Sequence, residues 1–350
     1  MFMNKLICLG IESTAHTLGF AIMDSDKKVY ANVKHGFVTK EGGMKPVEVV
    51  DHHVEWCDKV LKECLDKSGL SLKDINLVSF SQGPGIGHML KIGAFISRYI
   101  SLKLKVPLVG VNHCIAHLTI GKALTGAKDP VLLYASGANT QIIALEGGKY
   151  RIFGETLDIG VGNFLDTFAR YIGLGFPGGP KIYELALKGK NLIEIPYVVK
   201  GMDVSFTGIL TNLKQKYDSG KYYKEDLCFS LQETVFAMLL EVTERAMAHC
   251  DKNELLLGGG VACNKLLQDM TKRMCYDREA KCFILENQYN VDNAAMIAWQ
   301  GILEYQVMKR DPDIKRTKVK PYWRTDDVLV SWVDWIFLLL ILFFILFFLH

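Results

Sequence analysis

The chain has 350 residues, 49% of them hydrophobic, and its 41 basic and 38 acidic side chains nearly balance. This balance excludes a protein that is basic over its whole surface, so any contact with nucleic acid must come from a local patch. The length allows a large core and favours two domains. The chain has nine cysteines, an odd number with no CxxC spacing, which indicates a reducing compartment. The N-terminus has no secretory pattern, and we expect a cytoplasmic protein.

Two segments in different halves of the chain share one pattern. Residues 5–24 hold two apolar runs around a small, polar turn, and residues 131–146 repeat this order. The repeated strand–turn–strand pattern predicts an internal duplication. Residues 46–68 have a helical period, residues 75–81 are typical of a strand, and residues 89–103 predict a helix after a glycine-rich break. Because strands and helices alternate, we expect an α/β fold.

A pair of histidines follows a predicted strand at residues 106–111. On a helix, His113 and His117 would lie about one turn apart on one face, where they can bind one metal ion. An isolated pair of this spacing usually binds no metal, and the absence of Glu directly after His113 disfavours a zinc protease. Asp292, at the start of an Ala-rich segment, is the candidate third ligand, although it could instead cap that helix.

Small-residue turns follow predicted strands elsewhere in the chain. The Ser-Gly-Ala-Asn turn at residues 136–139 is suited to bring backbone close to a phosphate. At residues 255–260 an apolar strand meets three glycines before a helix that begins near Asn264. Glycines let the backbone approach a base or ribose, and a helix N-terminus favours an anion, but a tight turn alone would also explain this motif. Residues 160–180 hold two more such turns, with Asp166 able to reach a ribose hydroxyl.

The C-terminal region contains two unusual segments. Residues 315–320, continued by Arg324, form a basic run that could contact nucleic acid, although such runs are more often simply solvated. Residues 336–349 are apolar throughout but short for a membrane span, which needs about 20 residues. This segment could be a marginal anchor, a partner-binding segment or an artefact of the gene sequence. Its length makes membrane association doubtful.

Eight motifs between about residue 5 and residue 330 resemble one family in order and spacing. They are GIESTAHTLGFAI, SQGPGIGHML, NHCIAHL, YASGANTQ, GNFLDTFAR, GLGFPGGP, GGGVACN and VDNAAMIAW. The chain is similar to the archaeal and eukaryotic tRNA threonylcarbamoyladenosine synthases, the catalytic subunit of the KEOPS complex, formerly labelled O-sialoglycoprotein endopeptidases. The resemblance implies the duplicated actin, sugar-kinase and heat-shock-chaperone (ASKHA) fold, with a nucleotide and metal cleft between two lobes. We expect lobes at residues 1–127 and 128–330, and a tail at residues 331–350.

The resemblance also implies a reaction, ligands and partners. A threonylcarbamoyl group would pass from its adenylate to N6 of the adenosine 3′ of the anticodon in tRNAs that read codons beginning with A. His113, His117 and Asp292 would be catalytic and would bind one Fe²⁺ or Zn²⁺ ion, with Tyr134 at the metal. Threonylcarbamoyl-AMP, ATP or AMP would contact Tyr134, Ser136, Gly137, Ala138, Asn139, Asp166, Gly179, Tyr183, Glu184 and Asn264. The expected partners are tRNA and KEOPS subunits, including a small kinase-like ATPase.

The chain departs from the family pattern at two positions. Tyr183 stands where the family usually has Glu, and Glu184 follows one place later, rotated by about 100° on a helix. Ala138 replaces a second glycine that is frequent in the family, which should be tolerated if its φ is negative. The alternative functions are those of a sugar-kinase-like or chaperone-like ATPase of the same fold. A sugar kinase would not need a helical histidine pair.

Overall fold

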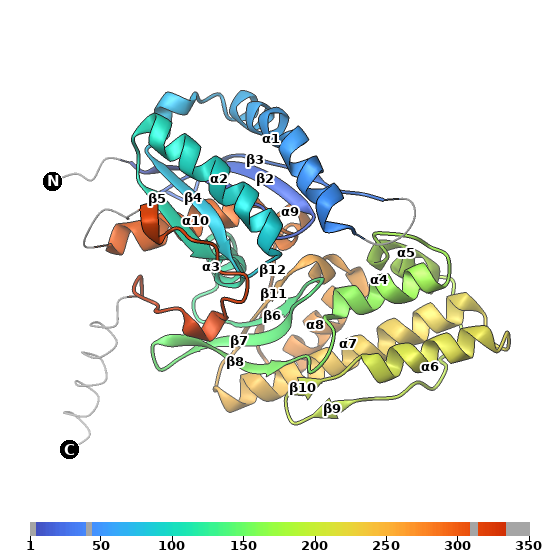
Figure 1. Cartoon of the computed structure of the whole chain (residues 1–350). Helices are drawn as coiled ribbons and strands as arrows, with labels where there is room; N and C mark the ends of the chain where they lie inside the picture. Colours follow the sequence, from blue (N-terminus) through green and yellow to red (C-terminus); the bar gives the residue numbers. More distant parts are fainter. Residues whose placement is uncertain (1–4, 40–43, 309–313, 334–350) are drawn as a thin grey trace, which may run out of the picture.

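Two five-stranded sheets organise the computed structural model, which describes residues 5–39, 44–308 and 314–333 (Figure 1). The apolar run at residues 336–349, whose role the sequence left open, lies outside the described residues. Within the described part of the chain, no helix is both long enough and apolar enough to cross a membrane.

The two sheets have the same topology. The first has the order β3-β2-β1-β4-β5, and the second has the order β12-β11-β6-β7-β8. In each sheet an antiparallel three-stranded meander is extended by two parallel strands. The strands are β1 Ile7–Glu12, β2 Thr17–Asp24, β3 Val29–Gly36, β4 Leu77–Gly83, β5 Leu108–Asn112, β6 Val131–Ala135, β7 Thr140–Glu146, β8 Lys149–Glu155, β11 Glu254–Gly258 and β12 Lys281–Ile284. The predicted internal duplication is therefore confirmed.

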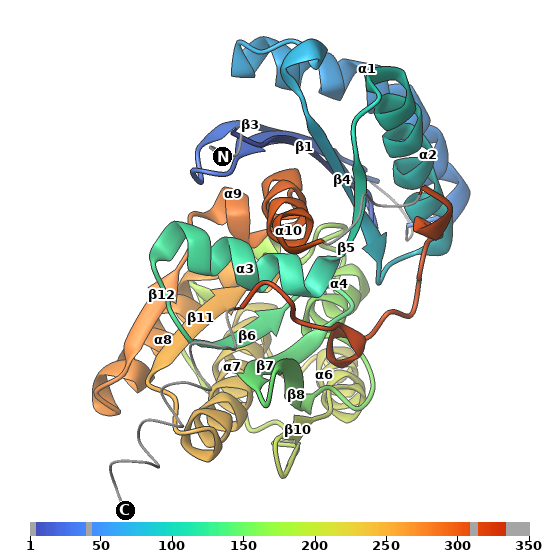
Figure 2. The same ribbon diagram turned by 90° about the vertical axis from the view of Figure 1, so that its left-hand side faces the viewer.

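The helices cover the sheets and fill the space between them (Figure 2). They are α1 Pro46–Ser68, α2 Gly87–Leu104, α3 His113–Thr125, α4 Val161–Tyr171, α5 Gly179–Ala186, α6 Thr207–Asp218, α7 Lys224–His249, α8 Lys265–Asp277, α9 Asn287–Asn290 and α10 Ala294–Val307. The short elements are β9 Val199–Lys200, β10 Asp203–Val204 and the 3₁₀ helices η1 Leu72–Asp74, η2 Gly260–Cys263, η3 Ile314–Arg316 and η4 Thr325–Asp327. Helices α1 and α2 pack on one face of the first sheet, and α10 packs on its other face (Figure 2).

Helix α10 belongs to the packing of the first sheet although it follows the second sheet in the chain. Its Met296 and Ile297 share a buried cluster with Cys8 and Leu77. The approach is close because Gly10 has no side chain: a Cβ there would lie 2.3 Å from the Ala294 carbonyl oxygen. The C-terminal half of the chain thus completes the first lobe, and the lobe boundary at residues 127 and 128 stays a prediction.

The segment 314–333 returns across the first sheet toward the histidine pair. The Gln82 side chain donates to the Lys318 carbonyl at 2.7 Å, and the Asn112 side chain donates to the Trp323 carbonyl at 3.3 Å. The ammonium group of Lys320 lies 3.9 Å from the centre of the Trp323 ring. The predicted basic run is therefore anchored through its backbone, and its contact with nucleic acid stays a prediction.

Candidate active site and metal centre

The predicted metal ligands converge between the two sheets. The Nε2 atoms of His113 and His117 each lie 3.4 Å from the Oδ1 atom of Asp292. One ligand atom from each residue lies within 4.8 Å of the others. Both imidazoles are buried, whereas the Asp292 side chain keeps 19% of its surface exposed. Among the described residues, this is the one group of three or more such side chains that could hold a metal ion.

The end of strand β5 places the histidines. The Asn112 side chain accepts hydrogen bonds from the backbone N–H groups of Cys114 and Ile115, at 3.0 and 3.2 Å. This N-cap starts α3 at His113, so that His113 and His117 share one face of the helix. Cys114 instead packs in an apolar cluster, and burial raises the pKa of its thiol. It is therefore not a reactive nucleophile.

Asp292 does not cap α10. Its neighbour Asn293 does so, because the Asn293 side chain accepts a hydrogen bond from the Met296 N–H at 3.1 Å. The carboxylate of Asp292 is free to face the imidazoles, while its carbonyl accepts a hydrogen bond from the Lys34 ammonium at 3.3 Å. The choice between ligand and cap, open from the sequence, is decided by this geometry against the cap.

Glu12, at the end of β1, is a site residue that the sequence analysis missed. Its side chain is fully buried, and its Oε2 atom lies 3.1 Å from the Nδ1 atom of His113. Its Oε1 atom accepts hydrogen bonds from the N–H group and the hydroxyl of Thr14, at 2.7 and 2.5 Å. A carboxylate behind a ligating imidazole fixes the ring and its tautomer. The available signal was a Glu that ends an otherwise apolar strand.

The buried ligand atoms that lack a partner support a metal at this site. Burial lowers the pKa of His113, but the carboxylates of Glu12 and Asp292 outweigh it and hold that pKa well above the usual value. Burial lowers the pKa of His117, and neither nitrogen of its buried ring makes a hydrogen bond of good geometry with a described residue. Burial would raise the pKa of Asp292, but the two imidazoles, whose Nε2 atoms lie 3.4 Å from its Oδ1 atom, hold it well below its usual range. A divalent cation would satisfy these ligand atoms, and two imidazoles with one carboxylate suit zinc or iron.

The predicted phosphate turn lies beside the metal ligands. The buried Tyr134, in β6, has its ring 4.9 Å from the His117 ring, and its side chain is close enough to Ser136 for that residue to act on its pKa. The Ser136 N–H donates to the Asn139 carbonyl at 2.8 Å, which closes the turn. Ala138 has a negative φ, so an alanine fits at this position, where the family often has glycine.

Three glycines from other segments press against this turn. A Cβ atom at Gly160 would lie 2.4 Å from the Gly137 carbonyl oxygen, and one at Gly162 would lie 2.7 Å from that of Ser136. Gly259 has a φ of 91°, and a Cβ there would lie 2.3 Å from the Ala135 carbonyl oxygen. The glycines predicted to let backbone approach a ligand thus also let three backbone segments approach one another.

Asp166 and Asn264, two predicted nucleotide contacts, already have partners within the protein. Asp166 accepts a hydrogen bond from the Gly178 N–H at 2.6 Å, and burial raises its pKa. Asn264 caps α8, accepting from Leu266 N–H at 2.9 Å, and donates to Gln232 at 2.5 Å. Their contact with a nucleotide stays a prediction.

The remaining predicted contacts lie on α5. Gly179 begins this helix and has open space where a Cβ would stand. Tyr183 is half-buried and close enough to Lys265 of α8 to act on its pKa, whereas Glu184 is exposed. The ribose contact of a carboxylate at position 183 or 184 therefore stays a prediction.

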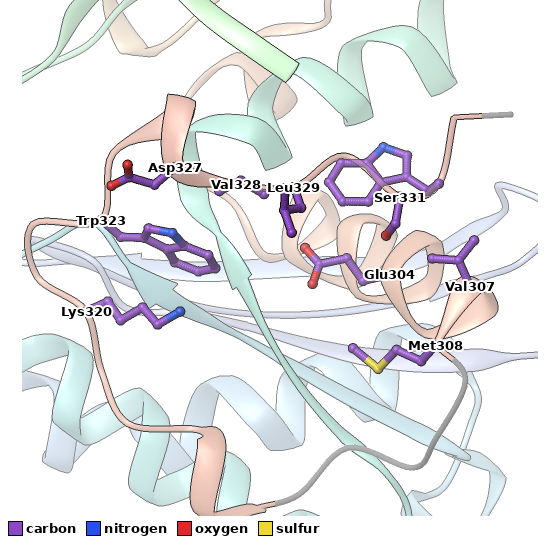
Figure 3. Close-up of a pocket in the computed structure, with 10 residues that line it drawn as sticks. Glu304, Val307, Met308, Lys320, Trp323, Asp327, Val328, Leu329 and Ser331 are labelled. Carbon is purple, nitrogen blue, oxygen red and sulfur yellow. The ribbon is translucent and has the colours of Figure 1, made fainter. Parts of the chain in front are cut away.

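A cavity of about 320 Å³ lies between α10 and the C-terminal segment, and none of the predicted site residues lines it (Figure 3). Glu304 and Lys320 contribute charges to it, and Trp323 and Trp332 contribute aromatic rings. Burial raises the pKa of Glu304 to about 7, although its carboxylate accepts a hydrogen bond from Gln300 at 2.9 Å.

Comparison with known proteins places the chain in a family. The sequence profile of the family described as tRNA N6-adenosine threonylcarbamoyltransferase matches residues 28–299. A protein of that name from Thermococcus kodakarensis is 53% identical over 327 residues, which are 93% of this chain and 100% of the relative. This chain belongs to that family. It is therefore a tRNA N6-adenosine threonylcarbamoyltransferase, and the two ATPase alternatives are set aside.

Further comparisons concern a longer relative and the fold. A Methanocaldococcus jannaschii protein, named a probable bifunctional tRNA threonylcarbamoyladenosine biosynthesis protein, is 48% identical; the match covers 94% of this chain and 61% of the relative. The structure of T. kodakarensis HypF superposes with a TM-score of 0.60 at 13% identity, over 85% of this chain and 47% of that one. The (R)-2-hydroxyglutaryl-CoA dehydratase component A of Acidaminococcus fermentans gives 0.53 at 13% identity, over 84% and 96%. The predicted ASKHA fold is thereby confirmed.

Proposed function

We propose that the donor is threonylcarbamoyl-adenylate and that the acceptor is N6 of the adenosine 3′ of the anticodon, in tRNAs that read codons beginning with A. The position of Tyr134 carries the proposal, because its ring lies 4.9 Å from the His117 ring and it stands two residues before Ser136, where the turn begins. It brings a candidate metal centre next to a turn suited to phosphate. An adenylate whose phosphate lay in this turn would have its carbamoyl group beside the metal ligands.

The protein's own residues would hold the adenylate and leave the chemistry to the tRNA amine. Backbone N–H groups of residues 136–139 would bind the phosphate. The amine nitrogen forms a bond to the carbamoyl carbon, the bond from that carbon to the phosphate oxygen breaks, AMP leaves with the electron pair, and the amine loses a proton. No nucleophilic side chain is required. When bound by His113, His117 and Asp292, a divalent ion would supply Lewis-acid stabilisation of the developing negative charge.

We further propose Fe²⁺ or Zn²⁺ as the ion. Both accept two imidazoles and one carboxylate with an open coordination position. Glu12 would keep the Nδ1 atom of His113 as the donor, so that its Nε2 atom faces the ion.

The proposed partners are tRNA, a small kinase-like ATPase and further KEOPS subunits, in the cytoplasm, where the tRNA substrate is available. The longer bifunctional relative supports a second activity that works alongside this one. The isolated chain should therefore transfer poorly and gain activity when partners are added. Binding of tRNA should weaken steeply as salt rises, as phosphate contacts require.

Depletion of the protein in cells tests the reaction. Nucleoside analysis should show loss of N6-threonylcarbamoyladenosine from tRNAs that read codons beginning with A, and expression of the wild-type chain should restore it. Retention of the modified nucleoside after complete depletion would refute the proposal.

A further inference from the structure

Lys34 is a cation beside the metal ligands that the proposed chemistry does not yet use. It lies on β3, the edge strand of the first sheet, and its ammonium donates a hydrogen bond to the Asp292 carbonyl oxygen at 3.3 Å. The Asp292 carboxylate itself faces the imidazoles of His113 and His117. Among the described residues, no carboxylate forms a salt bridge with Lys34, and the residue is exposed. Its charge is therefore accessible to a ligand.

The register of the first sheet fixes the direction of this side chain. Gly19 on β2 pairs with Glu12 on one side and with Lys34 on the other. Residues directly opposite one another in neighbouring strands project from the same face of the sheet, and strands about 5 Å apart put Glu12 and Lys34 about 10 Å apart. Gly19 leaves room between them for the start of α10, since a Cβ there would lie 3.5 Å from that of Ala294. One face of the sheet thus presents a carboxylate and an ammonium on either side of this helix start.

The two charged groups reach the same site from these two positions. Glu12 contacts the Nδ1 atom of His113, and Lys34 contacts the carbonyl of Asp292. An ammonium group has further N–H groups besides the one bonded to Asp292, and these can bind the oxygens of an anion. A ligand that fits has a carbonyl oxygen for the metal and an anionic group close to it.

The proposed donor has this arrangement. In threonylcarbamoyl-adenylate, only the carbamoyl nitrogen and the Cα atom of threonine separate the carbamoyl carbon from the carboxylate carbon. The phosphate lies on the other side of the carbamoyl group, where the turn at residues 136–139 would bind it. The carboxylate therefore extends away from this turn and needs a cation of its own.

We propose that Lys34 binds the carboxylate of the threonine moiety and is a specificity-determining residue for the donor. The inference rests on the proposed function. A bond to the Asp292 carbonyl needs only a neutral donor, whereas a carboxylate ligand calls for a charge. A phosphate of the bound tRNA is another source of anionic oxygen. The bond to Asp292 favours the carboxylate, because it holds the ammonium next to a metal ligand, where the carbamoyl group would lie.

Two donors and three variants test this assignment. The donors are threonylcarbamoyl-AMP and its threoninol analogue, in which a CH₂OH group replaces the carboxylate. Lys34→Met keeps the apolar stem without the charge, Lys34→Arg keeps the charge, and Lys62→Met, at an exposed position of α1, is the control. Transfer to tRNA in the presence of the partners gives kcat and KM for each donor. Titration of the metal-free proteins with Co²⁺ gives their metal affinity.

We expect Lys34→Met to raise KM for threonylcarbamoyl-AMP about tenfold and to leave KM for the analogue unchanged, since only the first donor loses a charged hydrogen bond. Lys34→Arg should keep most of the wild-type preference, and Lys62→Met should keep all of it. Binding of Co²⁺ should be equal in all four proteins.

Three results would overturn the inference while the wild type still transfers from threonylcarbamoyl-AMP. An equal rise in KM for both donors, or a loss of Co²⁺ affinity, would mean that Lys34 only supports Asp292. A higher KM for tRNA with an unchanged KM for the donor would assign Lys34 to a tRNA phosphate. Failure of the wild type to use threonylcarbamoyl-AMP at all would instead refute the proposed function, and this inference with it.

Discussion

The Nδ1 atom of His113 lies 3.1 Å from the Oε2 atom of Glu12, which joins the end of β1 to the start of α3. The Glu12 carboxylate therefore holds the His113 ring through its Nδ1 atom, and the Nε2 atom is directed at Asp292. The two strand ends that meet here, β1 and β5, belong to the same sheet. His113 is thus oriented by the first sheet, while Tyr134 and the phosphate turn come from the second sheet.

Glu12→Gln should weaken metal binding without removing a ligand. The amide keeps the size of the side chain but loses the charge that supports His113, and such changes typically cost 10- to 100-fold in metal affinity. Competition titration with a chromophoric chelator measures the change. Glu194→Gln, on the exposed surface, is the control. An affinity for Zn²⁺ equal to that of the wild type would show that Glu12 does not support the site.

Asn264 can be tested for two roles at once. Asn264→Ala removes the N-cap of α8 and should cost about 1 kcal/mol of stability, whereas Asn264→Ser keeps a capping oxygen. If the amide also contacts the nucleotide, both variants should bind AMP several-fold more weakly in calorimetry. Wild-type affinity in Asn264→Ser would leave this residue only its capping role.

Gly160→Ala should disturb the phosphate turn. The new Cβ would meet backbone atoms of Gly137 and Ala138 at 2.4 and 2.5 Å, and backbone cannot move aside as a side chain can. We expect AMP affinity to fall at least tenfold, with a clear loss of melting temperature. Gly208→Ala, on α6 with open space around it, is the matched control and should keep both. Normal nucleotide binding by Gly160→Ala would argue against this turn as the phosphate site.

Stability should depend on pH through Glu304. Its pKa of about 7 in the folded protein exceeds the value near 4.3 expected in the unfolded chain. The folded state therefore holds a proton that the unfolded state has lost, and stability falls as pH rises from about 4 to 7. Glu304→Gln should remove this fall and gain about 2 to 3 kcal/mol relative to wild type between pH 5 and pH 8, measured by urea unfolding. An equal difference at both pH values would contradict the raised pKa.

The sequence predicted most of the regular structure because the patterns are local. Helix α1 has the predicted bounds, residues 46–68, since its period and its terminal Pro46 and Gly69 are visible in one window. The duplicated meander was visible for the same reason. The packing of α10 on the first sheet could not be predicted in this way, because the packing joins segments that lie far apart in the chain.

The candidate site was predictable only where residue type and spacing carry the chemistry. The two histidines and Asp292 were found in this way. Glu12 was missed because a buried carboxylate at a strand end has no distinctive spacing, and its meaning comes from the contact with His113. Asn264 shows the opposite case. Its place at the start of a helix suggested a nucleotide contact, but its role as the N-cap of α8 explains that place equally well.

The central claim is that His113, His117 and Asp292 bind a metal that this family member needs for threonylcarbamoyl transfer to tRNA. The most direct measurement combines metal content with modification of tRNA by purified protein, its partners and threonylcarbamoyl-adenylate. We expect His117→Ala to hold less than a tenth of the wild-type metal and to form almost no N6-threonylcarbamoyladenosine, while Thr119→Val, on the same helix, keeps both. Full modification by metal-free His117→Ala would contradict the account.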